Sequence, residues 1–488
     1  MPQEPTHPAP LDDRLWNEDL APVPQSGRTW TTWNIAALWI GMAVCIPTYT
    51  LASGLIGQGM NWSQAVITIF LGNLIVLVPM TLNAHPGTAY GIPFPVLLRA
   101  SFGTFGSNIP ALMRGIVACG WFGIQTWVGG AAIYSTAAVV LGFDPALRQA
   151  LPVLGISAGE FSCFLAFWAV NVFFIWRGME SIKWLEMLSA PFLLIIGLVL
   201  VYWAWSAADG FGPIFSQPSK LDTHAAFWPV FGAGLTAMVG YWATLSLNIP
   251  DFSRHARSQR DQIIGQAIGL PTTMTLYSFI GILVTSATLV IFGTALWDPV
   301  QVIARFDNPW VSALALLTLA IATLSTNIAA NVVSPANDFS NLAPRHINFR
   351  TGGLITAFIG LLMFPWKLYQ DPSGYIFTWL IGYSALLGPI AGIMIADYFL
   401  WRRRRLVVAD LYKRHGAYRY SGGFSLVGFG ALALAVLPNI PGFLVTIRVL
   451  PAETFPSVIV AGYHYAWFVG FGLAFGIYSL LRPLMPNR

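Results

Sequence analysis

The residues G-M-A-V-C-I-P, from Gly41 to Pro47, interrupt the first long apolar run of the chain, which extends over about 33–55. Proline has no backbone N–H, so in a continuous helix the carbonyl of Ala43 would lose its partner, and the ring would clash with that turn. An unpaired carbonyl inside a membrane costs several kcal/mol. The sequence therefore predicts one of two structures. Either the helix is kinked and groups of neighbouring helices pair with the free carbonyl, or the helix is broken and its free carbonyls bind a small cation.

The composition of the whole chain is that of an all-α membrane protein. Of 488 residues, 56% are hydrophobic and only 9% are charged, whereas ordinary soluble domains contain about 25% charged residues. So few charges cannot cover a water-facing surface, which argues against a soluble enzyme, a nucleic-acid binder or a secreted disulfide scaffold. Cys45, Cys119 and Cys163 lie within apolar runs and match neither a disulfide framework nor a zinc motif.

Apolar runs of about 20 residues, the length that crosses a bilayer core, recur along the chain. We count twelve: 33–55, 63–83, 106–135, 160–177, 184–206, 226–249, 263–292, 311–336, 351–366, 374–401, 423–440 and 459–482. If the amino terminus is cytoplasmic, most of the 25 Lys and Arg residues fall on the cytoplasmic side, as expected for a multi-pass protein. We therefore predict an inner (plasma) membrane protein with both termini in the cytoplasm.

The sixth run, 226–249, is interrupted by three glycines, Gly232, Gly234 and Gly240. The first and sixth runs are separated by five spans, and interrupted helices at matching places in two halves predict an inverted repeat with the substrate site beside both breaks. The expected organisation is a polar tail, two repeats and two final helices, and 84–105 is expected to be an intracellular linking helix or a re-entrant piece. The expected boundaries are 1–29, 30–207, 226–402 and 420–483.

The eighth run carries two polar faces. At about 100° per residue, Ala322, Ser325 and Thr326 share one arc, and Asn327 and Asn331 share another. Uncharged hydroxyls suit a cation that is already partly held by carbonyls, and the two amides offer donors and acceptors. The alternative interpretation is hydrogen bonding between helices, which is a common use of such residues in membranes.

The third and sixth runs supply aromatic residues. Trp121 and Gln125 are four residues apart and share a helix face. An indole plane beside an amide suits a flat heterocycle with amide edges, although tryptophan often only packs between helices, the role we assign to Trp127. A buried glutamine is costly without a partner, which makes Gln125 informative. Tyr241 and Trp242, just after the second break, are expected to form a second aromatic wall.

Ionisable residues are almost absent from the deep parts of the runs. A proton relay normally requires membrane carboxylates, so this pattern favours an uncharged substrate and a directly bound metal ion. The seven histidines contain no H-E-x-x-H pair, and no serine or cysteine has an evident base at helical spacing. We therefore expect neither an enzyme nor a cofactor, although a membrane transferase with loop carboxylates stays open.

Six motifs are spread over nearly the whole chain: Asn17–Leu20, Ile46–Tyr49, Tyr90–Phe94, Trp121–Trp127, Leu247–Phe252 and Asn327–Pro335. Together they resemble the nucleobase:cation symporter-1 family. The resemblance implies a secondary transporter of nucleobases, allantoin, hydantoins or related vitamins. It also implies twelve transmembrane helices in a five-plus-five inverted repeat, the LeuT-like fold, with spans 1 and 6 broken.

The resemblance assigns functional residues by motif. The stacking tryptophan and pairing glutamine of the family fall at Trp121 and Gln125, its span 6 aromatic at Trp242, and its span 8 asparagines at Asn327 and Asn331. In sodium-coupled hydantoin carriers of this family, two carbonyls of span 1 and one carbonyl and two hydroxyls of span 8 hold the cation. The matching positions here are Gly41, Val44, Ala322, Ser325 and Thr326.

Both hydroxyls of that cation set are present, which supports sodium as the coupling ion. Cys45 is a departure, because the hydantoin carrier has a glutamine near this place and a thiol is a poor hydrogen-bond partner. We therefore predict a monomeric sodium symporter for a neutral nucleobase-like or hydantoin-like ring that contacts no nucleic acid. The alternatives are a proton-coupled purine, cytosine or uracil permease, and a membrane receptor that binds such rings without transporting them.

Overall fold

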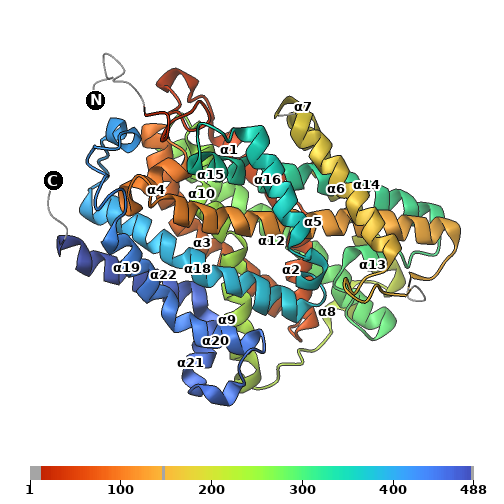
Figure 1. Ribbon diagram of the computed structural model, residues 1–488. Helices are drawn as coiled ribbons and strands as arrows, with labels where there is room; N and C mark the ends of the chain where they lie inside the picture. Colours follow the sequence, from red (N-terminus) through yellow and green to blue (C-terminus); the bar gives the residue numbers. More distant parts are fainter. Residues whose placement is uncertain (1–11, 146–148, 178, 485–488) are drawn as a thin grey trace.

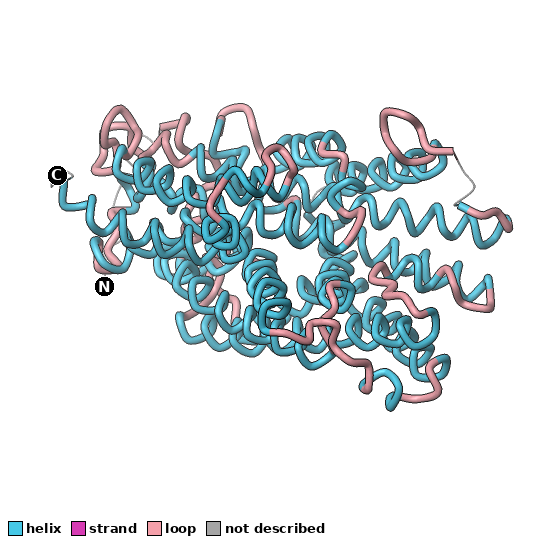
Figure 2. The backbone as a smooth tube through the Cα atoms, turned by 90° about the horizontal axis from the view of Figure 1, so that it is seen from below, coloured by secondary structure: helices cyan, strands magenta, loops and turns pink. Residues whose placement is uncertain are grey.

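The computed structural model describes residues 12–145, 149–177 and 179–484. The regular structure of this part of the chain is helical, with no strand (Figure 2). The elements before the second predicted break are α1 (Thr32–Ala43), α2 (Ile46–Gly57), α3 (Trp62–Tyr90), α4 (Phe94–Phe102), α5 (Asn108–Leu141), α6 (Ala158–Arg177), α7 (Met179–Ala207) and α8 (Phe211–Phe215). Residues 1–11 of the expected polar tail lie outside the described residues.

The second part of the chain continues in the same way. Its helices are α9 (His224–Tyr241), α10 (Ala243–Asn248), α11 (Pro250–Ser253), α12 (Gln259–Phe292), α13 (Pro299–Ile303), α14 (Pro309–Asn331), α15 (Val333–Leu342), α16 (Phe349–Leu362), α17 (Pro365–Leu368), α18 (Ile381–Ile395), α19 (Leu426–Val436), α20 (Ile440–Thr446), α21 (Ser457–Gly462) and α22 (Ala466–Leu481). Two π-helical segments, Gly374–Leu380 and Ala396–Trp401, flank α18.

Membrane-spanning capacity agrees with a multi-pass protein. Among the described residues, 8 helical stretches are long and apolar enough to cross a membrane, or 9 if the bent pair α1 and α2 is one span. The expected runs 184–206, 226–249 and 351–366 fall on α7, on α9 with α10, and on α16, which are not among those stretches.

The chain direction changes sharply between α1 and α2. The two helices are bent by 57°, and Cys45 between them is extended, with φ −152° and ψ 161°. The Cys45 amide donates to the Ala43 carbonyl at 3.1 Å, so it does not reach Gly41 as it would in a continuing helix. Pro47 lies in the first turn of α2, where a missing N–H costs nothing. The second interruption is shorter, because only Trp242 separates α9 from α10.

The linking segment 84–105 is divided by Gly91. α3 continues to Tyr90, Gly91 is left-handed with φ 73°, and α4 begins at Phe94. A Cβ on Gly91 would lie 2.4 Å from the carbonyl oxygen of Val23, so only glycine fits. α4 has 9 residues, too few to cross a bilayer.

Long helices connect two ends of the molecule. In Figure 1, α4 and α15 lie at the upper left, and α8 and α21 lie at the lower end. α5 packs against α14 and α6, and α12 packs against α1, α2 and α3. The two helix breaks and the polar part of α14 are therefore enclosed by other helices.

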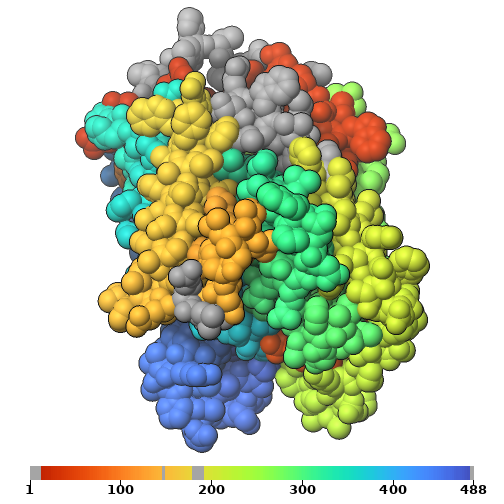
Figure 3. All heavy atoms as spheres, turned by 90° about the vertical axis from the view of Figure 1, so that its right-hand side faces the viewer, coloured from red at the N-terminus to blue at the C-terminus, as the bar shows by residue number. Residues whose placement is uncertain are grey.

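One face of α14 is directed away from this interior. Figure 3 shows α14 between α5 and α7, both of which it contacts. Trp310, Leu314 and Ile321 expose 73%, 69% and 55% of their surface. Large apolar side chains exposed in this way are expected to contact lipid. The helix is thus apolar outside and polar inside.

Candidate substrate and cation sites

A small cavity lies where the two helix interruptions meet α5 and α14. Its volume is about 30 Å³, far below the roughly 150 Å³ of a cavity that can hold benzene. A planar ring can therefore enter only if side chains or helices of the wall move. The lining residues are Met42, Cys45, Trp121, Gln125, Tyr241, Trp242, Thr244, Leu245, Thr326, Ala330 and Asn331. Five of the six expected substrate residues are in this wall, together with one expected cation ligand.

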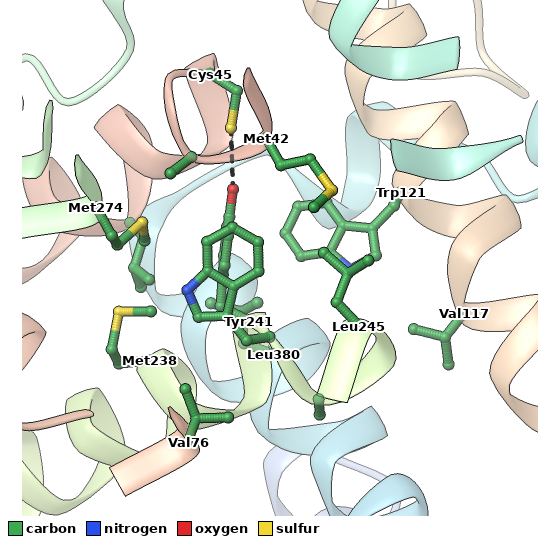
Figure 4. Packing of buried hydrophobic residues seen from close by; sticks show 14 of the residues in the cluster. Met42, Cys45, Val76, Val117, Trp121, Met238, Tyr241, Leu245, Met274 and Leu380 are labelled. Atoms are coloured by element: carbon green, nitrogen blue, oxygen red, sulfur yellow. Dashed lines mark hydrogen bonds between the residues drawn. The ribbon is translucent and has the colours of Figure 1, made fainter. Parts of the chain in front are cut away.

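Tyr241 occupies the space between the two expected stacking tryptophans. Its ring centroid is 5.2 Å from that of Trp121 and 4.8 Å from that of Trp242, with interplanar angles of 72° and 84°. Figure 4 shows Tyr241 beside Trp121 in this cluster. A ring stacked on Trp121 would have to displace Tyr241. Tyr241 was expected only as part of a second wall, and a local sequence pattern gives no sign of this intervening position.

Trp242 contacts one polar and one aromatic neighbour that do not line the cavity. Its indole N–H donates to Oδ1 of Asn73 at 3.1 Å, and its ring meets Trp39 edge-on at 5.2 Å. Asn73 is fully buried on α3. The indole of Trp242 therefore has a fixed orientation at the second interruption, and sequence reasoning missed the residue that fixes it.

Cys45 lines the cavity, but its thiol has partners. Sγ lies 3.1 Å from the hydroxyl of Tyr241 (Figure 4). The same Sγ lies 3.3 Å from the hydroxyl of Thr48. The two hydroxyls are themselves 3.1 Å apart. These three side chains form a closed polar contact between the start of α2 and the end of α9.

The amides of the wall differ in their contacts. Gln125 is 4% exposed, and its Oε1 is buried without a hydrogen-bond partner. Asn331 donates from Nδ2 to Oδ1 of Asn327 at 3.0 Å. Asn327 is fully buried and does not line the cavity. Of the expected pair, only Asn331 therefore lines the cavity, and Asn327 lies behind it and accepts its hydrogen bond.

The expected cation ligands lie on α14 and at the end of α1, two helices that contact each other. Oγ of Ser325 is buried without a partner, and Thr326 donates to the carbonyl of Ala322 at 3.3 Å. On the other side, the Val44 amide donates to Ile40 at 3.2 Å. A buried hydroxyl without a partner, on a helix that contacts α1, has the chemistry of a ligand for a small cation, which prefers oxygen ligands and needs them to replace its water shell.

A buried ion pair was not foreseen. Nη1 of Arg114 lies 3.2 Å from Oδ2 of Asp338, with side-chain exposures of 1% and 0%, and Nη2 of Arg114 donates to Oδ1 of Asn248 at 2.9 Å. Asn248 also bonds Ser334. The sequence does not show that Arg114, near the start of run 106–135, and Asp338, just after run 311–336, meet as a buried pair.

An all-helical chain with many apolar spans, and with a cavity placed at two helix interruptions, has the architecture of a membrane permease. The family model described as "Permease for cytosine/purines, uracil, thiamine, allantoin" matches residues 22–470. The chain belongs to this family, the nucleobase:cation symporter-1 family that its motifs resemble, and it is a multi-pass membrane permease and not an enzyme.

Several relatives cover almost the entire chain. A purine-uracil permease of Arabidopsis thaliana is 45% identical over 480 residues, which are 98% of this chain and 79% of the relative. An allantoin permease of Bacillus subtilis is 43% identical over 479 residues, which are 97% and 94%. The solved inward-facing structure of Mhp1 superimposes with a TM-score of 0.78 at 26% identity, covering 97% of this chain and 95% of Mhp1. A closed conformation of that transporter with bromovinylhydantoin bound gives 0.76.

Proposed function

We propose that this permease imports a neutral planar heterocycle, such as allantoin, hydantoin or a nucleobase, together with sodium. The proposal is carried by the cavity, where Trp121, Gln125 and Asn331 surround one small space. An indole face offers stacking to a flat ring, and two amides offer hydrogen bonds to its edge. Among the residues that the structure describes, none with a carboxylate or a cationic side chain lines this cavity, which suits an uncharged ring.

The names of relatives support the substrate class. The two relatives described above are named as purine-uracil and allantoin permeases, and a hydantoin permease of Microbacterium maritypicum is 30% identical over 439 residues, 86% of this chain and 83% of the relative. These compounds share flat rings with amide-like edges. The Cys45 thiol already contacts Tyr241 and Thr48. We therefore infer that Cys45 packs in the cavity wall and does not hydrogen-bond the substrate ring.

The proposed architecture has twelve transmembrane helices in a five-plus-five inverted repeat. Its support is the pair of interruptions, between α1 and α2 and between α9 and α10. In this scheme residues 30–207 and 226–402 form the two repeats, and 420–483 form the last two helices. The protein would be a monomer in the inner (plasma) membrane, with both termini in the cytoplasm.

Sodium would be held by the carbonyls of Gly41, Val44 and Ala322 and by the hydroxyls of Ser325 and Thr326. Such an ion would join α1 to α14, the helix that also carries Asn331. Sodium and substrate would both favour the outward-open state, and each would therefore strengthen binding of the other. The two bundles would then move around this central site in alternating access.

Uptake into proteoliposomes tests the proposal. Labelled allantoin, uracil and hydantoin are supplied with an inward sodium gradient or an inward pH gradient. We expect uptake of at least one ring with sodium. Uptake that follows only the pH gradient would show the proton-coupled alternative, and binding without counterflow of labelled ring would show a receptor.

A matched pair of variants tests the cation site. Ser325→Ala removes an unpartnered buried hydroxyl from the proposed site, and Ser312→Ala removes another unpartnered buried hydroxyl from the same helix, far from the break. We expect only Ser325→Ala to raise the sodium concentration needed for half-maximal uptake. Equal behaviour of the two variants would contradict the assignment.

A further inference from the structure

A chain of three amides leads from the cavity wall into the protein. Nδ2 of Asn331 donates to Oδ1 of Asn327 at 3.0 Å, and Nδ2 of Asn327 donates to Oδ1 of Asn171 at 3.1 Å. Asn171 lies on α6 and donates to the carbonyl of Phe167 at 2.8 Å. Asn327 and Asn171 are fully buried, and Asn331 is 6% exposed. The orientation of each amide is therefore linked to that of the next.

Two backbone carbonyls determine which end of each amide donates and which accepts in this series of hydrogen bonds, because a carbonyl oxygen can only accept. The Phe167 carbonyl holds the NH₂ group of Asn171, which leaves Oδ1 facing Asn327. The Phe122 carbonyl accepts from Thr126 at 2.7 Å and from Nδ2 of Asn327 at 3.2 Å. The hydroxyl proton of Thr126 is thereby used, so its oxygen accepts from Asn327 at 3.1 Å.

Three acceptors thus surround Nδ2 of Asn327. If this amide were turned, its oxygen would face oxygens only, and several buried groups would lose their hydrogen bonds. Oδ1 of Asn327 must therefore face Asn331, and Asn331 donates to it from its NH₂ group. Among the described residues none donates to Oδ1 of Asn331, so this oxygen is left for the cavity that Asn331 lines.

Gln125, on the same cavity, has no such constraint. Its Oε1 is buried without a partner, and no hydrogen bond to a described residue fixes its NH₂ group. Gln125 can therefore present either end of its amide. The wall combines one amide of fixed direction with one that can turn.

We propose that Asn171 is a positioning residue that fixes Asn331 as a hydrogen-bond acceptor, so that recognition requires a ring N–H at that edge. Gln125 then accepts either a ring carbonyl or a second N–H. The favoured substrates are cyclic ureides and imides that carry an N–H on the edge facing Asn331. This inference rests on the proposed function, because it assumes that such rings bind in this cavity.

Binding of hydantoin, succinimide and 3-methylhydantoin to the purified protein in sodium tests the inference. Succinimide has CH₂ in place of one ring N–H of hydantoin, and 3-methylhydantoin lacks the other. In the unmodified protein, at least one of the two analogues should bind about 100-fold more weakly than hydantoin, because its missing N–H leaves the acceptor on Asn331 unpaired. We call this ratio of affinities the penalty. In Asn171→Leu, hydantoin should bind about tenfold more weakly, and the penalty caused by removing the N–H should shrink about tenfold. Asn327 then keeps only two of its three acceptors, so its amide, and with it that of Asn331, is held less firmly in one direction.

Three further variants separate positioning from folding. Asn171→Asp keeps an acceptor toward Asn327 and, as a buried neutral acid, a donor toward Phe167, so it should restore the penalty. Thr126→Val removes another acceptor from Asn327 and should reduce the penalty even if Asn171→Leu does not fold. Asn439→Ala removes a buried amide that donates to the carbonyl of Ala466 at 3.2 Å, and neither residue lines the cavity. This variant should leave the penalty unchanged.

An unchanged penalty in Asn171→Leu and Thr126→Val, or an equal reduction in Asn439→Ala, would overturn the inference while the proposed function stands. Failure of the unmodified protein to bind any of these rings, or allantoin and uracil, would overturn the proposed function and this inference with it.

Discussion

The thiol of Cys45, in the break between α1 and α2, lies 3.1 Å from the hydroxyl of Tyr241 at the end of α9. This contact joins the two helix interruptions directly. It also places Tyr241 against Trp121, where a substrate ring is proposed to stack. Opening the cavity must therefore separate Cys45 from Tyr241, which makes this pair a reporter of the motion.

We expect the Cys45 thiol to react slowly with a small polar thiol reagent and to be protected further by substrate. Cys45 is 2% exposed in the wall of the cavity, so the reagent must wait for opening. The measurement uses the variant in which Cys119 and Cys163 are serines, with labelling followed by mass spectrometry. Labelling that is fast and indifferent to every candidate ring would contradict the position of Cys45 in the substrate cavity.

Asn73 should stabilise the orientation of Trp242. Asn73→Leu leaves the buried indole N–H without its acceptor, which is expected to cost about 1–3 kcal/mol. Trp242→Phe removes the donor as well, so adding it to Asn73→Leu should recover part of the stability. Thermal unfolding of the two single variants and the double variant measures this coupling. Strictly additive losses would show that the 3.1 Å contact carries no energy.

Local periodicity explains which residues could be predicted from the sequence. The spacing of Trp121 and Gln125, and the place of Asn331 on α14, follow from helix geometry alone, and all three line one cavity. The break just before Pro47 is consistent with the missing N–H of that proline, which suits the first turn of a helix and not its interior. Apolar run length likewise predicts most of the long helices, although it does not mark their ends or separate α3 from α4 at Gly91.

The residues that sequence reasoning missed are partners of those it found. Asn171 meets Asn327 across 156 positions of the chain, Asn73 meets Trp242 across 169, and Arg114 meets Asp338 across 224. A pattern of period 3.6 determines which face of a helix is polar, but not which helix packs against that face. These contacts depend on tertiary packing, which a single sequence does not encode locally.

Asp338→Asn should destabilise the protein strongly. The variant leaves Arg114 as a charge in a buried environment, since both side chains are at most 1% exposed, and breaking such a pair is expected to cost about 3–5 kcal/mol. Denaturant unfolding in detergent measures the loss. The control is Asp13→Asn, which breaks the exposed pair with Arg345 and should leave stability unchanged. Replacement of both Arg114 and Asp338 by apolar residues of similar size should recover much of the loss.

Acidification should loosen the segment before α1 through His255. Burial, with the charge of Arg254 as a smaller cause, lowers the pKa of His255 from 6.5 to about 4. The backbone of His255 accepts from Trp30 at 2.9 Å, and its ring lies 5.4 Å from that of Trp30. Between about pH 6.5 and 4 the unfolded chain binds more protons than the folded one, so stability rises with pH across this window and falls as pH drops through it.

The thermal midpoint, measured from pH 7 to pH 4, should therefore decrease less in His255→Gln than in the unmodified protein. His415, an exposed histidine in the basic loop before α19, provides the control as His415→Gln. Parallel pH profiles for the unmodified protein and His255→Gln would exclude His255 as the cause, because a glutamine at that position has no proton to gain.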